Sequence, residues 1–208
     1  MNGPYHDSKT VNGDVGRMGA STFIFITGGV RSGKSSHAEC LAIDMARKTG
    51  GQPNYIATGV PSDPEMQHRV AMHQRSRDSG VFRWKTIEKP IQIGALANSI
   101  SDKDIVLLDC VTTLLNNELF SSEQTWNESY LKTIKQDILT GIMSIKSRAG
   151  AMIVVSNEVL NELPIASELV FSYSRLLGKI HQDLVKEADK AILVEAGIPL
   201  VMKEVVAR

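Results

Sequence analysis

Two consecutive stretches, FIFIT at residues 23–27 and GGVRSGKS at residues 28–35, decide the fold of this chain. The first is an apolar run of β-branched and aromatic side chains, which predicts a buried strand. The second matches the pattern G-x-x-x-x-G-K-S/T in full, and residues 36–48 continue with a helical pattern. Because the glycine-rich motif stands between a strand and a helix, it predicts a nucleoside triphosphate site rather than an ordinary turn.

Each part of this motif suits the binding of phosphate. Glycines let successive backbone N–H groups converge on phosphate oxygens, and the following helix adds its positive N-terminal end. We expect Lys34 to reach the β- and γ-phosphates and the Ser35 hydroxyl to ligate Mg²⁺. The predicted nucleotide contacts in this loop are Gly28, Gly29, Val30, Arg31, Ser32, Gly33, Lys34 and Ser35.

Composition narrows the class of protein. The 208 residues carry 23 Lys and Arg against 23 Asp and Glu, which argues against a nucleic-acid or membrane surface. No apolar run approaches the roughly 20 residues of a membrane span. The two cysteines, Cys40 and Cys110, have no metal spacing and are interpreted as reduced core thiols of a cytoplasmic protein. Residues 1–20 are expected to be a disordered leader, and residues 21–208 a single catalytic domain.

Further strands are predicted to alternate with helices along the chain. This alternation predicts an α/β fold of the P-loop NTPase (RecA-like) class, a mostly parallel sheet flanked by helices with an antiparallel C-terminal hairpin. The expected strands are 54–57, 82–88, 105–109, 151–156, 190–195 and 200–203. The expected helices are 63–78, 90–100, 125–147 and 167–188.

Ligands of such sheets gather at the carboxyl ends of the strands, which here are marked by Thr58, Glu88, Asp109 and Asn157. Asp109 ends the apolar run at residues 105–108 and is predicted to hold Mg²⁺ through water, opposite Ser35. A simple capping role for this acid is the alternative.

A second informative segment contains Arg69, His73 and Arg77, which share one face of the predicted helix because they are four residues apart. Two guanidinium groups beside an imidazole suit a polyphosphate, and they favour the neutral, nucleophilic form of the histidine. The spacing alone favours a solvated basic helix face that carries an incidental histidine, and His68 is the rival histidine.

Ordered blocks of the chain resemble the bifunctional adenosylcobinamide kinase/adenosylcobinamide-phosphate guanylyltransferase family of cobalamin biosynthesis. The blocks are Thr27–Glu39, Tyr55–Thr58, Asp63–His73, Trp84–Glu88, Leu108–Thr112, Val155–Val159 and Gly178–Leu184. The chain departs from the family pattern at Gln74–Asp78 and at Leu160–Pro164, where many members have a basic stretch and a glycine-rich loop.

The resemblance implies two reactions. The enzyme would phosphorylate adenosylcobinamide with ATP or GTP, and then transfer GMP from GTP to adenosylcobinamide phosphate. It implies that His73 carries GMP covalently, that Lys34 serves catalysis, that Mg²⁺ is required, and that the chain forms a homo-oligomer, commonly a trimer. The implied guanine-nucleotide contacts, besides the loop at residues 28–35, are Ala57, Thr58, Gly59, Gln74, Arg75, Ser76, Arg77, Glu88 and Asp109.

Two other functions remain compatible with the motif alone. A small-molecule P-loop kinase without guanylyltransferase activity explains Lys34, Ser35 and Asp109 but gives no role to His73. A non-catalytic nucleotide-binding switch is less consistent with the sequence, because the guanine-reading signature N-K-x-D is missing from the chain.

Overall fold

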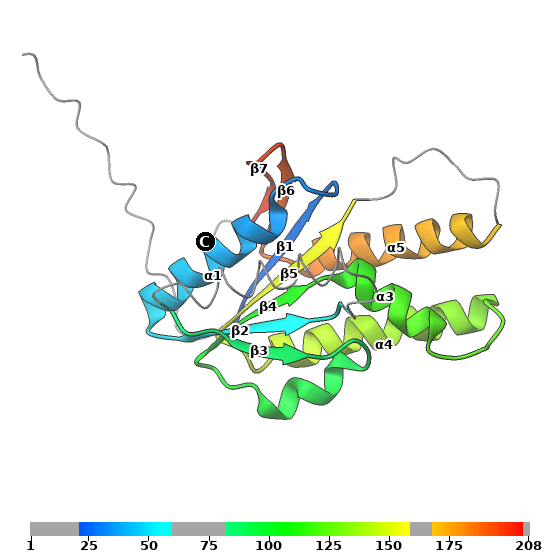
Figure 1. Ribbon diagram of the computed structural model, residues 1–208, viewed down its shortest axis with the longest axis horizontal. Coiled ribbons are helices and arrows are strands. Elements are labelled where there is room, and N and C mark those ends of the chain that lie inside the picture. Colours follow the sequence, from blue (N-terminus) through cyan, green and yellow to red (C-terminus); the bar gives the residue numbers. More distant parts are fainter. Residues whose placement is uncertain (1–20, 60–81, 159–167, 206–208) are drawn as a thin grey trace, which may run out of the picture.

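The computed structural model describes residues 21–59, 82–158 and 168–205 of the chain. Its centre is a seven-stranded sheet in the order β3-β2-β4-β5-β1-β6-β7 (Figure 1). The strands are β1 (Thr22–Gly28), β2 (Gln52–Ala57), β3 (Lys85–Glu88), β4 (Asp104–Asp109), β5 (Ala151–Asn157), β6 (Lys190–Glu195) and β7 (Ile198–Glu204). The helices are α1 (Lys34–Thr49), the 3₁₀ helix η1 (Ile93–Ser99), α3 (Val111–Phe120), α4 (Glu128–Lys146) and α5 (Glu168–Glu187).

The P-loop strand β1 lies inside the sheet and pairs in parallel with both β5 and β6. Strand β5 separates β1 from β4, the strand that ends at Asp109. The last two strands, β6 and β7, pair antiparallel as a hairpin. The prediction of a RecA-like P-loop fold with a mostly parallel sheet and an antiparallel C-terminal hairpin is therefore confirmed.

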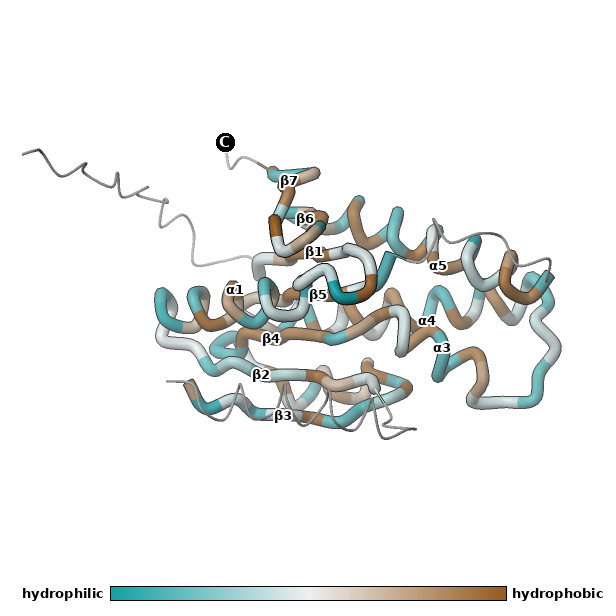
Figure 2. Tube along the Cα trace, turned by 45° about the horizontal axis from the view of Figure 1, so that its top comes forward, coloured by the Kyte–Doolittle hydropathy of each residue, from teal (hydrophilic) through white to brown (hydrophobic). Residues whose placement is uncertain are grey.

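The sheet separates two apolar layers, because alternate side chains of a strand point to opposite faces. In β4, Ile105 and Leu107 pack beneath α1, whereas Val106 and Leu108 pack against α3, α4 and α5. Figure 1 shows the two helical layers, and Figure 2 shows the apolar strands that run between them. Since helices cover both faces, these strands are apolar throughout rather than alternating.

Some sequence-based predictions need correction. Helix α3 was not expected, because its β-branched start at residues 111–113 has low helix propensity; burial of Leu114, Leu115 and Leu119 stabilises it. Residues 93–99 form a 3₁₀ helix, and β3 begins only at Lys85. Cys110 is buried as predicted, but Cys40 is exposed on α1 and is not a core thiol.

The predicted helix at residues 63–78, with Arg69, His73 and Arg77, lies outside the described residues. Within the part that the structure describes, no helix is long and apolar enough to cross a membrane.

Candidate nucleotide site at the carboxyl edge of the sheet

The glycine-rich loop connects β1 to α1 and presents an uncapped helix N-terminus. Gly33 immediately precedes the helix in a left-handed conformation with φ of 90°, which glycine adopts without strain. No side chain caps the first turn of α1, and no acidic residue lies in it. The first N–H groups of the helix therefore face the loop without a competing negative charge, as a site for an anion requires.

The ammonium group of Lys34 is held inside this loop. Its side chain is only 6% exposed, and Nζ donates a 3.0 Å hydrogen bond to the carbonyl oxygen of Gly29. An ammonium group held inside this loop can donate charge-assisted hydrogen bonds to phosphate oxygens.

The C-terminal hairpin braces the loop from the side. The N–H of Gly197, in the turn between β6 and β7, donates a 2.9 Å hydrogen bond to the carbonyl oxygen of Ser32. Any Cβ at Gly28 would collide with the carbonyl oxygen of Val194 in β6, so the first glycine of the motif is sterically required. The Ser32 hydroxyl is buried in this contact without a hydrogen-bond partner among the described residues.

Asp109 occupies the end of β4 and is fixed by an aromatic hydroxyl. The hydroxyl of Tyr55 in β2 donates to Oδ2 of Asp109 across 3.0 Å. Tyr55 packs with the apolar layer beneath α1, so the carboxylate lies on the same side of the sheet as the glycine-rich loop. This is the side on which Asp109 and Ser35 could hold one cation between them.

The ends of β2 and β4 are joined by a buried threonine. The backbone N–H of Cys110 donates to Oγ1 of Thr58 at 2.8 Å, and the Thr58 hydroxyl donates to the Cys110 carbonyl oxygen at 2.9 Å. Burial, followed by the charge of Asp109, raises the pKa of the Cys110 thiol. The thiol is therefore neutral at physiological pH and belongs to the structural support of the site.

Asn117 of α3 joins the two loops that follow β2 and β3. Its Nδ2 donates to the carbonyl oxygen of Thr58 at 2.8 Å and to that of Pro90 at 3.1 Å. Ala57 is in register with both Glu88 and Asp109, so the three strand ends lie at one level. Neither Asn117 nor Tyr55 was singled out as a site residue from the sequence, because their hydrogen-bond partners are between 27 and 59 positions away in the chain.

The structure thus brings most of the predicted site residues to one edge of the sheet. The residues gathered there are Gly28, Gly29, Val30, Arg31, Ser32, Gly33, Lys34, Ser35, Ala57, Thr58, Gly59, Glu88 and Asp109. The remaining predicted contacts, His73 and Gln74–Arg77, lie outside the described residues.

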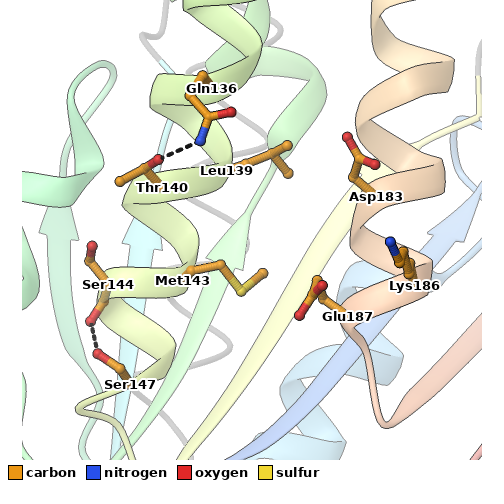
Figure 3. Close-up of a pocket in the computed structure, with 9 residues that line it drawn as sticks. All are labelled: Gln136, Leu139, Thr140, Met143, Ser144, Ser147, Asp183, Lys186 and Glu187. Atoms are coloured by element: carbon orange, nitrogen blue, oxygen red, sulfur yellow. Dashed lines mark hydrogen bonds between the residues drawn. The ribbon is translucent and has the colours of Figure 1, made fainter.

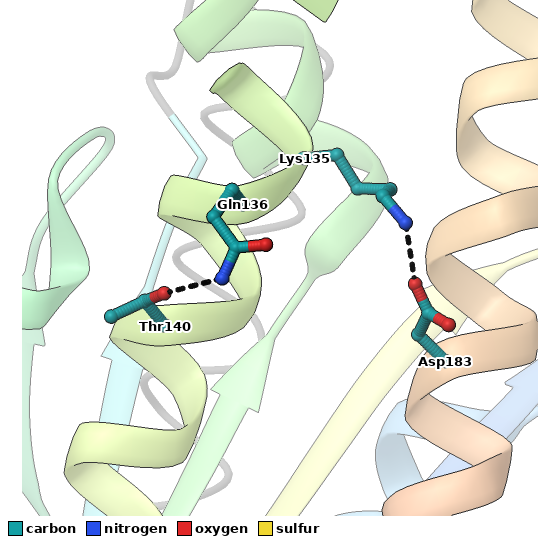
Figure 4. Close-up of polar contacts among 4 residues, drawn as sticks. All are labelled: Lys135, Gln136, Thr140 and Asp183. Atoms are coloured by element: carbon teal, nitrogen blue, oxygen red, sulfur yellow. Dashed lines mark hydrogen bonds and ion pairs between the residues drawn. The ribbon is translucent and has the colours of Figure 1, made fainter. Parts of the chain in front are cut away.

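A groove of about 570 Å³ between α4 and α5 is a separate feature. It lies in the helical layer opposite α1 and is lined by residues such as Leu139, Met143 and Glu187 (Figure 3). Lys135 spans the two helices to Asp183 at 2.7 Å (Figure 4). None of the glycine-rich loop lines this groove, so it belongs to helix packing rather than to the nucleotide site.

The fold and this edge define a P-loop nucleotide-binding protein. The sequence profile of the cobinamide kinase / cobinamide phosphate guanyltransferase family matches residues 24–202, and the chain belongs to this family.

The alignments with two named relatives extend over nearly the whole length of those proteins. The chain is 32% identical over 187 residues to the bifunctional adenosylcobalamin biosynthesis protein CobU of Escherichia coli K12, which spans 86% of this chain and 99% of that protein. It is 31% identical over 180 residues to the corresponding CobP protein of Pseudomonas aeruginosa PAO1, spanning 86% and 95%. Among solved structures, a KaiC-like protein of Pyrococcus horikoshii OT3 aligns with a TM-score of 0.49 at 12% identity, covering 88% of this chain and 79% of that one.

Proposed function

We propose that this protein phosphorylates adenosylcobinamide with ATP or GTP and then transfers GMP from GTP to the product, giving adenosylcobinamide-GDP. The observation that carries the proposal is the family match over residues 24–202, which includes an intact phosphate-binding loop. Residues 21–208 would act in both reactions as one catalytic unit.

In the kinase step, the loop at residues 28–35 would hold the triphosphate. Lys34 would move from the Gly29 carbonyl oxygen to the β- and γ-phosphates, where its charge opposes the negative charge that accumulates during transfer. The acceptor hydroxyl forms a bond to the γ-phosphorus as the bond to the β–γ bridging oxygen breaks.

The donor set at this edge fits Mg²⁺. A serine hydroxyl and one carboxylate, completed by phosphate oxygens and water, are ligands that Mg²⁺ commonly takes. Ser35 and, through water, Asp109 would hold the ion, and the ion would supply charge stabilisation to the phosphates. Within residues 21–59, 82–158 and 168–205, no cluster of three His, Cys, Asp or Glu could hold a metal alone, which supports binding together with the nucleotide.

In the second step, the imidazole of His73 would attack the α-phosphorus of GTP. A P–N bond forms while the α–β P–O bond breaks, and pyrophosphate leaves. A phosphate oxygen of adenosylcobinamide phosphate then attacks the same phosphorus and releases the imidazole. A covalent intermediate divides one difficult transfer into two displacements, and the implied contacts at Ala57–Gly59, Gln74–Arg77 and Glu88 would bind the guanine nucleotide.

Mass spectrometry of the protein after incubation with Mg²⁺ and GTP tests the proposal directly. We expect an acid-labile GMP adduct on the peptide that contains His73. The His73→Ala variant should lose this adduct and guanylyl transfer while phosphorylating adenosylcobinamide, whereas the control variant His68→Ala should keep both. Wild-type protein that binds GTP and phosphorylates adenosylcobinamide without forming any adduct would instead be a kinase alone.

We also propose that the chain forms a homo-oligomer, by resemblance a trimer, in the cytoplasm. The edge strand β7 supports an assembly, because Ile198 and Met202 are 62% and 68% exposed and apolar edge strands are usually covered. Light scattering coupled to gel filtration measures the mass, and a monomer of 22.8 kDa would contradict this proposal.

A further inference from the structure

Asn157 stands beside the start of the phosphate-binding loop. It is the last residue of β5 and lies in register with Gly28, the first residue of the glycine-rich motif. The next residue tightens this pairing, because the N–H of Glu158 donates to the carbonyl oxygen of Gly28 at 2.9 Å. The end of β5 is thus fixed against the loop that is proposed to hold the triphosphate.

The alternation of β5 puts Asn157 on the same face of the sheet as that loop. Ile153 and Val155, four and two residues earlier, pack in the apolar layer beneath α1. The side chain of Asn157 reaches across to β4, where its Nδ2 lies 3.8 Å from Sγ of Cys110. Its amide is therefore at the carboxyl edge between the loop and Asp109.

The cysteine that Asn157 contacts is next to the carboxylate of the site. Cys110 directly follows Asp109, the last residue of β4. Asn157 therefore contacts the residue adjacent to the carboxylate that is proposed to hold Mg²⁺ through water.

A buried chain of hydrogen bonds fixes the backbone at Asn157. Its N–H donates to Oγ1 of Thr112 at 2.8 Å, and that oxygen lies 3.0 Å from Oγ of Ser156. The Ser156 hydroxyl, fully buried, lies 2.7 Å from Nε2 of His181 in α5. Tyr173 of α5 also donates to the carbonyl oxygen of Thr112 at 3.1 Å, so α3 and α5 together set the end of β5.

We propose that the side-chain amide of Asn157 donates a hydrogen bond to the terminal phosphoryl group of the bound nucleotide, and that Thr112 is the positioning residue that holds it there. This inference rests on the proposed function for the presence of a triphosphate at the loop. Asn157 exchanges no proton during transfer. Its neutral N–H group stabilises the negative charge on the γ-phosphoryl oxygens in the transition state. Because the donor is already in place before the reaction, the site does not have to reorganise.

Two variants of Asn157 and one control variant in α3 test the contact. Asn157→Ala removes the donor, Asn157→Asp replaces it with a charge that repels phosphate, and Asn116→Ala changes an exposed asparagine of α3 as the control. We expect kcat of phosphoryl transfer to fall about 100-fold in Asn157→Ala, the size of effect seen when one transition-state donor is lost. The Asp variant should be slower still, and the control unchanged.

Equilibrium binding gives a second readout that does not depend on turnover. GTP carries the terminal phosphoryl group and GDP does not. Asn157→Ala should therefore lower the affinity for GTP about fivefold, the effect of losing one hydrogen bond, and leave the affinity for GDP unchanged. If the ratio of GTP affinity to GDP affinity is the same in Asn157→Ala as in the wild-type protein, the inference is overturned. If the variant loses the preference for GTP while the wild-type protein phosphorylates no cobinamide, the proposed function fails and the contact stands.

Thr112 is tested by removal and rescue of its hydroxyl. Thr112→Val keeps the shape and removes the acceptor of the Asn157 N–H, so it should reproduce the loss of kcat and of preference for GTP. Thr112→Ser keeps the hydroxyl and should restore both. A purely structural role predicts a lower melting temperature with equal losses for GTP and GDP, and that result would remove Thr112 as a positioning residue.

Discussion

The hydroxyl of Tyr55 donates a 3.0 Å hydrogen bond to Oδ2 of Asp109, although the two residues are 54 positions apart in the chain. The tyrosine ring is itself held by an edge contact with Trp84, with ring centroids 6.2 Å apart. One oxygen of the Asp109 carboxylate is thus oriented by a rigid side chain. The remaining lone pairs of the carboxylate can accept hydrogen bonds from water.

Tyr55→Phe should raise the Mg²⁺ concentration required for half-maximal kinase activity. The variant keeps the ring and removes only the group that orients Asp109, and loss of such an outer partner weakens metal binding about tenfold. A titration of kinase rate with Mg²⁺ measures the effect. Tyr130→Phe is the matched control, because Tyr130 hydrogen-bonds the carbonyl oxygens of Glu118 and Leu119 instead. An unchanged titration in Tyr55→Phe would show that the hydroxyl does not serve the cation.

Lys34→Ala should abolish phosphoryl transfer and guanylyl transfer together. The substitution removes the ammonium group that the loop keeps nearly buried, and both reactions need the triphosphate held there. Rates of both reactions and binding of GTP by calorimetry provide the measurement. Lys48→Ala, at the exposed end of the same helix, should behave as wild type. Undiminished kinase activity in Lys34→Ala would contradict the assignment of the loop.

Asn117→Ala should raise KM for GTP in guanylyl transfer more than it lowers kcat. The two hydrogen bonds that it removes hold the loops after β2 and β3, and their loss costs about 1 kcal/mol each. Steady-state kinetics and the melting temperature separate the effect on binding from the effect on stability. The exposed neighbour Asn116→Ala is the control, and equal KM values in the two variants would mean that Asn117 does not support the nucleotide.

The free energy of unfolding should fall as the pH drops below about 6.5, the ordinary pKa of histidine. Burial lowers the pKa of His181 in the folded protein, so the unfolded chain binds a proton that the folded chain does not. The contribution of His181 to the free energy of unfolding is fully present above pH 6.5. It is lost as the pH falls from 6.5 toward the lowered pKa, by up to about 1.4 kcal/mol per pH unit.

Urea unfolding of the wild-type protein and of His181→Gln between pH 8 and pH 5 measures this contribution. The pH dependence of the variant should be shallower, because the glutamine does not titrate. His37 also has a lowered pKa from burial, so His37→Gln serves as the comparison on α1. Parallel curves for wild type and His181→Gln would contradict the expected role of His181.

Local patterns predicted the parts of the fold in which neighbouring residues act together. The apolar run before the loop, the eight residues of the motif and the acid that ends β4 were each recognisable within a short window, and the mostly parallel sheet followed from α/β alternation. The contacts that orient the site were not predictable in this way. Thr58 meets Cys110, Asn117 meets Thr58, and Tyr173 meets Thr112 across 52, 59 and 61 positions, and no local pattern encodes such pairings.

The hydrogen bond between Gly197 and Ser32 also bears on the order in which the protein can mature during synthesis. The loop emerges from the ribosome early, but β1 lies between β5 and β6, and its brace is the turn after β6. Domains of this size generally fold as units once their chain is complete. A nascent chain that ends before residue 197 therefore carries the whole phosphate-binding motif without the neighbours that shape it, and competence to bind nucleotide arises only after residue 197 has been added.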